Sequence, residues 1–431
     1  MRRPSRPCGR LLPAALVLAL LGSALAACRD DAGSAPAPTS EQGVASGAAP
    51  DVLRGLERAL ARRTEAVRRG DAQAFGAGLA HGRPDFVRDQ RTWFANLTQL
   101  PLAELGYSLD RGTLVRHGDD YWVVVERSMQ LDGYDARPVI TPDRFRFTPG
   151  RRPGRYLIAS TTDPAWERSH HVQAQPWDTG PVEVRTGAGV LGVFDEASVG
   201  FARAVVSSTE DAIGTVAAAV PYTWSRTVVV YAPSDTDFLT SLEDVPGDDP
   251  ASLDAVAFPV ASGGTVAATR VVLNPRMLGR DATERDRLVR HEVTHVAIGQ
   301  HDDRAPVWLS EGIAERVSVQ PMPPQERRVP EAAVEQAQAG VEDLPDDATF
   351  NDADSGVHYA VAWWACEYVA DAFGEQTLWD LLDEMNRPGA DPDAILRELL
   401  GLTSQDLAVK AGRMIEATFA PPETGARRDR S

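Results

Sequence analysis

The hydrophobic residues of the first folded segment begin at helical spacing. Val52, Leu56 and Leu60 would share one face of a helix, and Gly70-Asp71 is a typical helix-ending pair. A second stretch with the same kind of spacing covers 86–97. The chain is therefore expected to start folding with two helices.

After these helices the pattern changes to the alternation that is typical of strands. The turn sequence at 117–120 lies within an alternating run over 113–126, which predicts a hairpin. Arg144-Phe145-Arg146-Phe147 alternates strictly, and 156–159 could form a further strand. This order predicts helices first and then a curved antiparallel sheet over about 51–165.

A second set of elements follows a Pro- and Gly-containing break. In order, we expect the break over 176–181, a strand over 182–185, a long helix from about Asp195 to Ala219, buried strands over 227–231 and 268–274, and mainly helices from Thr283 onward. These elements predict a mixed sheet beside a helical half. The fold class of the whole chain is therefore expected to be α+β.

The length and the net charge of the chain limit which functions are possible. The chain has 431 residues, enough for two or three domains. It carries 44 Lys and Arg against 62 Asp and Glu, a formal net charge of −18. A negative field of this size repels phosphate backbones, so we expect no nucleic-acid partner.

The first 28 residues have the pattern of an export signal. Four arginines precede an apolar run over 11–21 that is too short to span a bilayer. Leu25-Ala26-Ala27-Cys28 follows and resembles the lipobox of bacterial lipoproteins. The resemblance implies that Cys28 is acylated and anchors the protein to the extracytoplasmic face of the cell membrane.

The candidate chemistry lies in His291-Glu292-Val293-Thr294-His295. The run sits within a predicted helix that begins near a capping sequence at 283–286 and ends at Gly299. Imidazoles four residues apart project from one helix face, which is the spacing needed to bind a single metal ion with Glu292 beside it. Two partly exposed histidines on a helix are the alternative interpretation.

A second predicted helix follows, from Pro306 to about Pro321, and contains Trp308-Leu309-Ser310-Glu311-Gly312. Glu311 and Glu315 are four residues apart and share a face. With this segment the chain resembles the gluzincins, the thermolysin-like zinc metallopeptidases, and in particular their bacterial peptidase-MA-like branch, in which HExxH is followed by a Trp-Leu-x-Glu-Gly segment.

The resemblance implies a role for each matching residue. His291, His295 and Glu311 match the ligands of a catalytic Zn²⁺, and Glu292 matches the general base that takes a proton from a zinc-bound water. Glu315 matches the acid that orients the imidazole of His291. Three protein ligands leave a fourth position open, as catalytic zinc requires.

Other assignments remain open in the sequence. Tyr359 and His358 are both candidates for a second electrophile, and an ordinary core tyrosine is an equal alternative. His301 lies where a third histidine ligand of the metzincin pattern belongs. The turn glycine that this pattern needs at 298 is Ile298, which favours Glu311 as the third ligand instead.

The domain boundaries follow from these assignments. A signal peptide with lipobox over 1–28 and a flexible tether over 29–50 precede an accessory α+β domain over 51–175, a zinc peptidase-like domain over 180–420 and a disordered tail over 421–431. By element order, the accessory domain resembles the cystatin-like, nuclear-transport-factor-like cone. It is expected to be structural, to bind a partner, or to cap the active site.

The sequence therefore predicts a membrane-anchored, extracytoplasmic zinc metallopeptidase that hydrolyses peptide bonds of a peptide or protein substrate. Endopeptidase action is favoured, because no Gly-x-Met-Glu-Asn-type exopeptidase motif is present. The strand over 268–274 resembles the edge strand along which gluzincins lay an extended substrate, and a plain core strand is an equal alternative. The segment 321–354 is either a mobile rim over the cleft or inert surface. The alternative is a non-catalytic surface binding or sensor lipoprotein that keeps the zincin scaffold.

Overall fold

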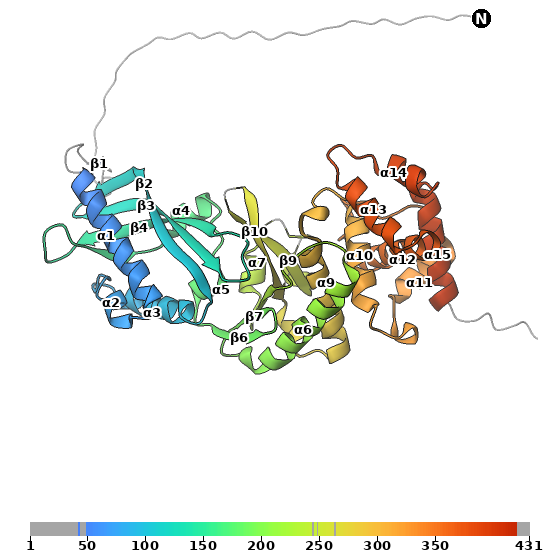
Figure 1. Cartoon of the computed structure of the whole chain (residues 1–431), viewed down its shortest axis with the longest axis horizontal. Helices are drawn as coiled ribbons and strands as arrows, with labels where there is room; N and C mark the ends of the chain where they lie inside the picture. Colours follow the sequence, from blue (N-terminus) through green and yellow to red (C-terminus); the bar gives the residue numbers. More distant parts are fainter. Residues whose placement is uncertain (1–41, 44–48, 244, 248, 263, 420–431) are drawn as a thin grey trace, which may run out of the picture. The chain divides into compact units, whose positions relative to one another are not determined.

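The computed structural model describes residues 42–43, 49–243, 245–247, 249–262 and 264–419 (Figure 1). From Gln42 onward the described residues belong to one compact unit with mixed helices and strands and two five-stranded sheets, so the predicted α+β class is confirmed. The predicted signal peptide with Cys28 and the tail over 421–431 lie outside the described residues, as does most of the tether over 29–50. Within the described part, no helix is long and apolar enough to cross a bilayer.

The first sheet is antiparallel throughout and has the order β1-β2-β3-β4-β5. Its strands are β1 Gln42–Gly43, β2 Leu102–His117, β3 Asp120–Leu131, β4 Val139–Pro149 and β5 Tyr156–Ser160. The helices of this region are α1 Ala49–Arg68, α2 Ala72–Gly76 and α3 Pro84–Leu97. Apart from the two-residue β1, the predicted order of helices first and antiparallel sheet second is confirmed.

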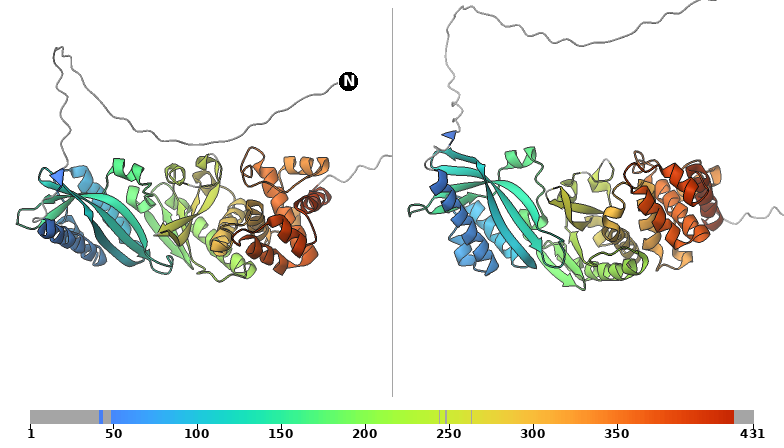
Figure 2. Two further views of the ribbon diagram at one scale, coloured as in Figure 1. Left: turned by 90° about the horizontal axis from the view of Figure 1, so that it is seen from above. Right: turned by 45° about the horizontal axis from the view of Figure 1, so that its top comes forward.

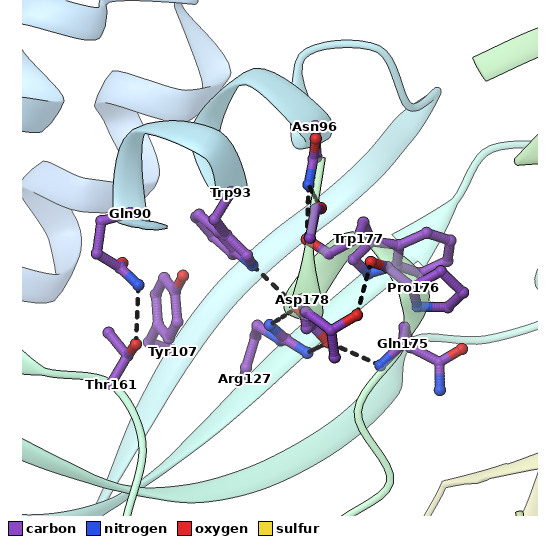
Figure 3. A network of polar contacts seen from close by, with 12 residues as sticks. Gln90, Trp93, Asn96, Tyr107, Arg127, Thr161, Gln175, Pro176, Trp177 and Asp178 are labelled. Atoms are coloured by element: carbon purple, nitrogen blue, oxygen red, sulfur yellow. Dashed lines mark hydrogen bonds and ion pairs between the residues drawn. The ribbon is translucent and has the colours of Figure 1, made fainter. Parts of the chain in front are cut away.

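A short connecting segment holds α4 Pro164–Ser169 and α5 Pro176–Thr179. Figure 3 shows how α5 is fixed to the first region. Asp178 accepts hydrogen bonds from Arg127 at 2.7 and 2.8 Å and from the Trp93 indole at 2.9 Å. Because all three side chains are largely shielded from water, this charged network holds the connection to β3 and α3.

The second sheet is mixed, as predicted, and has the order β6-β7-β8-β10-β9. Its strands are β6 Glu183–Gly187, β7 Val190–Phe194, β8 Val228–Ala232, β9 Ala255–Ser262 and β10 Thr265–Leu273. Of the two interpretations of 268–274, the sheet edge is wrong and the core strand is the one observed. β10 lies between β8, to which it is parallel, and β9, to which it is antiparallel, so β9 is the edge strand.

Helices cover one face of this sheet and continue into a helical half, drawn from green to red in Figure 1. The helices on this face and in the helical half (Figure 2) are α6 Ala202–Ala219, α8 Pro275–Leu278, α9 Ala282–Ile298, α10 Val307–Val319, α11 Glu331–Ala339, α12 Ser355–Phe373, α13 Glu375–Met385, α14 Pro392–Leu399 and α15 Ser404–Phe419. The short α7 Asp237–Thr240 packs on the opposite face of the sheet, where Phe238 contacts Tyr231. The predicted start of the long helix at Asp195 is wrong, because the Asp195 carboxylate accepts hydrogen bonds from the backbone of Ala197 and Ser198 and forms a turn.

The second sheet lies between two hydrophobic clusters. On β8, Val228 and Val230 face the helices, whereas Val229 and Tyr231 belong to the cluster that also contains the core of the first region. Strand residues alternate between faces, so a strand buried on both sides joins the two cores. The first region is thus packed against the second sheet rather than loosely attached.

One buried ion pair crosses this packing. Arg270 of β10 is 1% exposed and donates hydrogen bonds to Asp135 of the first region at 3.0 Å and to Gln175 and Tyr231 at 2.7 Å each. The loop beside Asp135 also meets β10 through the backbone, where Ala136 N–H donates to Ala267 O at 2.9 Å. Charge and backbone pairing therefore fix the two regions together.

We predict that Arg270→Met lowers the free energy of unfolding by about 3–5 kcal/mol, because it leaves the Asp135 carboxylate buried without its cation. Urea unfolding of the purified protein measures the change. The control is Arg185→Met, whose partner Glu183 is about half exposed and whose loss should cost less than about 1 kcal/mol. Equal losses in the two variants would contradict a special role for the buried pair.

Candidate metal centre

The candidate ligands begin on α9, whose start is fixed by a side-chain cap. The Asp281 carboxylate accepts hydrogen bonds from the backbone N–H groups of Thr283 and Glu284 at 2.9 and 3.1 Å, so the cap lies just before the sequence that we had expected to provide it. The helix ends at Gly299, as predicted, where φ is +58°. Val289 and Val293 pack into the core and hold the helix against the sheet.

The structure brings three predicted ligand atoms together. His291 Nε2 lies 3.2 Å from His295 Nε2 and 3.1 Å from Glu311 Oε2, and His295 Nε2 lies 3.5 Å from the same oxygen. Among the described residues, these three side chains form the group that could hold a metal ion. Glu311 reaches the two imidazoles from α10.

Carboxylates also face the far nitrogens of both imidazoles. Glu315 Oε1 is 3.4 Å from His291 Nδ1, and Asp302 Oδ2 is 3.7 Å from His295 Nδ1. An ionised carboxylate can only accept, so these contacts favour a proton on each Nδ1 and a free lone pair on each Nε2. Three acceptor atoms then point at one place, and a cation there would satisfy all of them.

The pKa values of the histidine and glutamate side chains also indicate that this site favours positive charge. Burial alone would lower the pKa of His291, yet its contacts with Glu311 and Glu315 raise it to about 9. Burial would raise the pKa of Glu315, but contacts with His291 and Arg287 lower it to about 2. The pKa of Glu311 is held far below its ordinary value by the two histidines, although burial opposes this shift.

The chemistry of the donors fits zinc. Ligand bonds of about 2.0–2.2 Å around a tetrahedral ion place neighbouring donor atoms about 3.3–3.5 Å apart. The three separations of 3.1, 3.2 and 3.5 Å are close to this range. Two imidazoles and one carboxylate suit Zn²⁺, whereas Mg²⁺ and Ca²⁺ prefer oxygen donors throughout.

Glu292 lies beside this group but does not belong to it. Its side chain is 5% exposed, and burial raises its pKa above the ordinary value. The backbone of Ala257 on β9 lies close to this carboxylate and lowers its pKa slightly, against the larger effect of burial. A carboxylate with a raised pKa next to a metal position is suited to accepting and returning a proton.

The two candidates for a second electrophile differ in their position relative to the ligands. Tyr359 lines the cavities beside the ligands, and its hydroxyl contacts Asn351 Oδ1 at 3.4 Å. Burial, reinforced by the charges of Glu311 and Glu292, raises the pKa of Tyr359, so the hydroxyl stays a proton donor. His358 instead contacts Phe350 O at 3.0 Å and is not among the described residues that line these cavities.

His301 also lies apart from the ligand group. Its Nδ1 is 3.1 Å from Asp383 Oδ1, and its ring stacks on Tyr222 with 3.7 Å between centroids. The side chain is about half exposed. The geometry therefore gives no support to the metzincin alternative.

The Trp-Leu-Ser-Glu-Gly segment does more than supply a ligand. Trp308 and Leu309 are buried in the core, and the Ser310 hydroxyl donates a 2.5 Å hydrogen bond to Asp302, which faces His295. Gly312 lies against α12, where a Cβ atom would overlap Ala362 O. The segment thus packs α10, supports one imidazole and sets how closely α10 approaches α12.

Two cavities meet at the ligands. One, of about 560 Å³, includes Arg287 from the N-terminal half of α9 and Arg280 from the turn before this helix in its wall. The other, of about 230 Å³, includes Gln300 and Asp303, which follow the C-terminal end of α9. Both contain His291, Glu292 and Tyr359, so open space extends from the ligands in two directions along β9.

Three further side chains and one backbone group near the site escaped the sequence reasoning. Arg287 pairs with Glu315, and its position four residues before His291 was a usable signal of a shared face. Asp302 and Asn351 carry no local signal, because folding alone brings them to His295 and Tyr359. The backbone of Ala257 could be found beside Glu292 only with the sheet order known.

Comparison of the sequence with protein-family models and with curated proteins finds no match. The functional interpretation consequently rests on the geometry of the side chains.

We predict that Glu315→Gln weakens zinc binding by about tenfold to a hundredfold, since the amide orients the His291 imidazole less firmly than a carboxylate does. Competition with a chromophoric chelator measures the affinity. Glu335→Gln, at an exposed position on α11, is the control and should bind zinc as the unmodified protein does. Unchanged affinity in Glu315→Gln would remove its assigned role.

We also predict that Gly312→Ala weakens zinc binding and lowers the stability of the fold. The new methyl group must push α10 away from Ala362 and carry Glu311 with it, which should lower the free energy of unfolding by about 1–3 kcal/mol. Gly214→Ala in α6 is the matched control, because its methyl group meets nothing within 4 Å. Thermal unfolding and zinc titration of both variants test the difference, and a Gly312→Ala protein with full zinc affinity would contradict it.

Proposed function

We propose that this protein is a zinc metallopeptidase of the gluzincin type that hydrolyses peptide bonds. The observation that carries the proposal is the convergence of His291 Nε2, His295 Nε2 and Glu311 Oε2 within 3.5 Å of one another. A buried glutamate lies beside them, and the cleft that contains them borders an edge strand. In this proposal, the region over 180–420 is the gluzincin domain and 51–175 is a cystatin-like or nuclear-transport-factor-like accessory domain.

The proposed chemistry divides between the metal and the chain. Bound zinc would polarise the substrate carbonyl and acidify the attacking water. Glu292 would accept the proton from that water and pass it to the leaving amine, a role consistent with its raised pKa. Tyr359 would donate a hydrogen bond to the oxygen that gains charge in the transition state.

The edge strand offers a way to hold the substrate. Ala257 directs its N–H toward Glu292 and away from β10, and Pro259, two residues on, presents its nitrogen to the same side. Proline tolerates an edge position because no partner strand there needs its missing N–H. The backbone carbonyl oxygens of Ala257 and Pro259 face this same side, so they can accept hydrogen bonds from an extended peptide that crosses the ligand group.

The proposed location follows from the N-terminal sequence. Cys28 in its lipobox would carry the lipid and tether the enzyme to the extracytoplasmic face of the membrane. A non-catalytic binding lipoprotein is the less favoured alternative. Such a protein would have no use for the buried Glu292 carboxylate, whose desolvation is unfavourable.

We predict that Glu292→Gln retains zinc but lowers peptide cleavage by at least about a hundredfold, because glutamine cannot accept the water proton. Incubation of the zinc-loaded protein with a diverse peptide library, read by mass spectrometry, detects the cuts. Glu335→Gln again serves as the control and should cleave normally. Cuts that persist in the Glu292→Gln protein would overturn the mechanism, and no cuts by the unmodified zinc-loaded protein would overturn the peptidase proposal.

A further inference from the structure

A third cavity, of about 420 Å³, lies where the first region meets the edge strand. One wall is the start of β4 in the first sheet, and another is the stretch 256–260 of β9. The loop 242–246 contributes Leu242, Val245 and Pro246. Most of the side chains that line it are apolar, so the cavity is suited to hydrophobic groups.

This cavity shares part of its wall with the candidate active site. Pro246, Val256, Ala257 and Pro259 line both it and the 230 Å³ cavity that contains the three ligands. Ala257 contacts Glu292, and a strand advances about 3.3 Å per residue, so Val260 lies roughly 10 Å further along the edge. The free side of β9 therefore runs from the metal position directly into the cavity at the first region.

The position of the first region is fixed by the contacts already described. The Arg270–Asp135 pair, the Ala136–Ala267 hydrogen bond and the Arg127–Asp178 pair of Figure 3 join it to the second sheet and to the connecting segment. The wall formed by β4 is consequently held in place before any ligand arrives. Binding to a preformed groove requires little ordering of the protein, so little free energy is lost.

Ile140 of β4 is unusual within this wall. It lines the cavity and is 37% exposed, one of few large hydrophobic side chains in the described structure with so much contact with water. Glu243 at the rim is already paired with His171 at 2.7 Å, so the rim charge is balanced locally. The wall of this cavity is therefore suited to binding an apolar group rather than a charged one.

We propose that the first region supplies a substrate subsite, in which apolar side chains of an extended polypeptide bind three to five residues before the scissile bond. The inference rests on the proposed peptidase function. The proposal includes an antiparallel orientation of the substrate along β9, in which it runs from Val260 toward Ala255 and places its N-terminal part against Ile140. The substrate class is thus an unfolded polypeptide segment long enough to reach from the metal to β4.

The first test is the pattern of cuts in the peptide library. Valine, isoleucine, leucine or phenylalanine should be enriched three to five positions before the cut. Cuts without such enrichment would overturn the subsite while leaving the peptidase intact. A complete absence of cuts would overturn the peptidase proposal and the subsite with it, so the two failures differ.

The second test measures binding without turnover. A 14-residue peptide taken from the library cuts and a four-residue peptide centred on the same bond are labelled, and their binding to the zinc-loaded Glu292→Gln protein is followed by fluorescence anisotropy. Adding Ile140→Asp should weaken binding of the long peptide by about tenfold and leave the short peptide unchanged, because only the long one reaches β4.

Leu399→Asp is the matched control, since Leu399 on α14 is also an aliphatic residue with 37% exposure. It should change neither affinity. Ile140→Ser provides a milder second variant, and thermal unfolding confirms that each protein is folded. Equal affinity of the long peptide for the Ile140 and Leu399 variants, or an equal loss for both peptides, would overturn the proposed subsite.

Discussion

The candidate metal centre depends on three acceptor atoms that lie close together in a largely buried site. His291 Nε2, His295 Nε2 and Glu311 Oε2 require either a metal ion between them or protons on the imidazoles, because leaving buried polar atoms unsatisfied is unfavourable. The side chains around these three atoms hold the two imidazoles in place. Glu315 and Asp302 face the outer nitrogens of the imidazoles, and Arg287 in turn holds Glu315.

That arrangement depends on how closely α10 approaches its neighbours. The glycine at 312 brings α10 against α12, and the same turn of helix carries Glu311 to the metal position and Ser310 to Asp302. A short segment therefore combines core packing with ligand placement. This physical reason explains why a glycine directly follows the ligand: a larger residue at 312 would move the carboxylate away from both histidines.

Local sequence could predict the parts of the site that depend on helix periodicity. The spacing of His291 and His295 placed both on one face of a helix, and the spacing of Glu311 and Glu315 did the same, without any tertiary information. The edge strand could not be found in this way. β9 and β10 are both largely buried, so their hydrophobicity does not distinguish an inner strand from an edge, and only Pro259 in β9 carried a hint. The turn at Asp195 was missed because the helical pattern that follows outweighed the side-chain hydrogen bonds that form the turn.

The shape of the cleft bears on whether the proposed enzyme attacks chain ends or chain interiors. Space continues from the ligands in both directions, into the 560 Å³ cavity on one side and through the 230 and 420 Å³ cavities on the other. An exopeptidase needs a wall with a charged group to receive a chain terminus. Of the two arginines in the larger cavity, Arg287 is already paired with Glu315, and Arg280 is about half exposed beside Glu284. A cleft that adjoins cavities on both sides, and whose two arginines are paired or half exposed, favours binding in the middle of a polypeptide, in agreement with the endopeptidase action expected from the sequence.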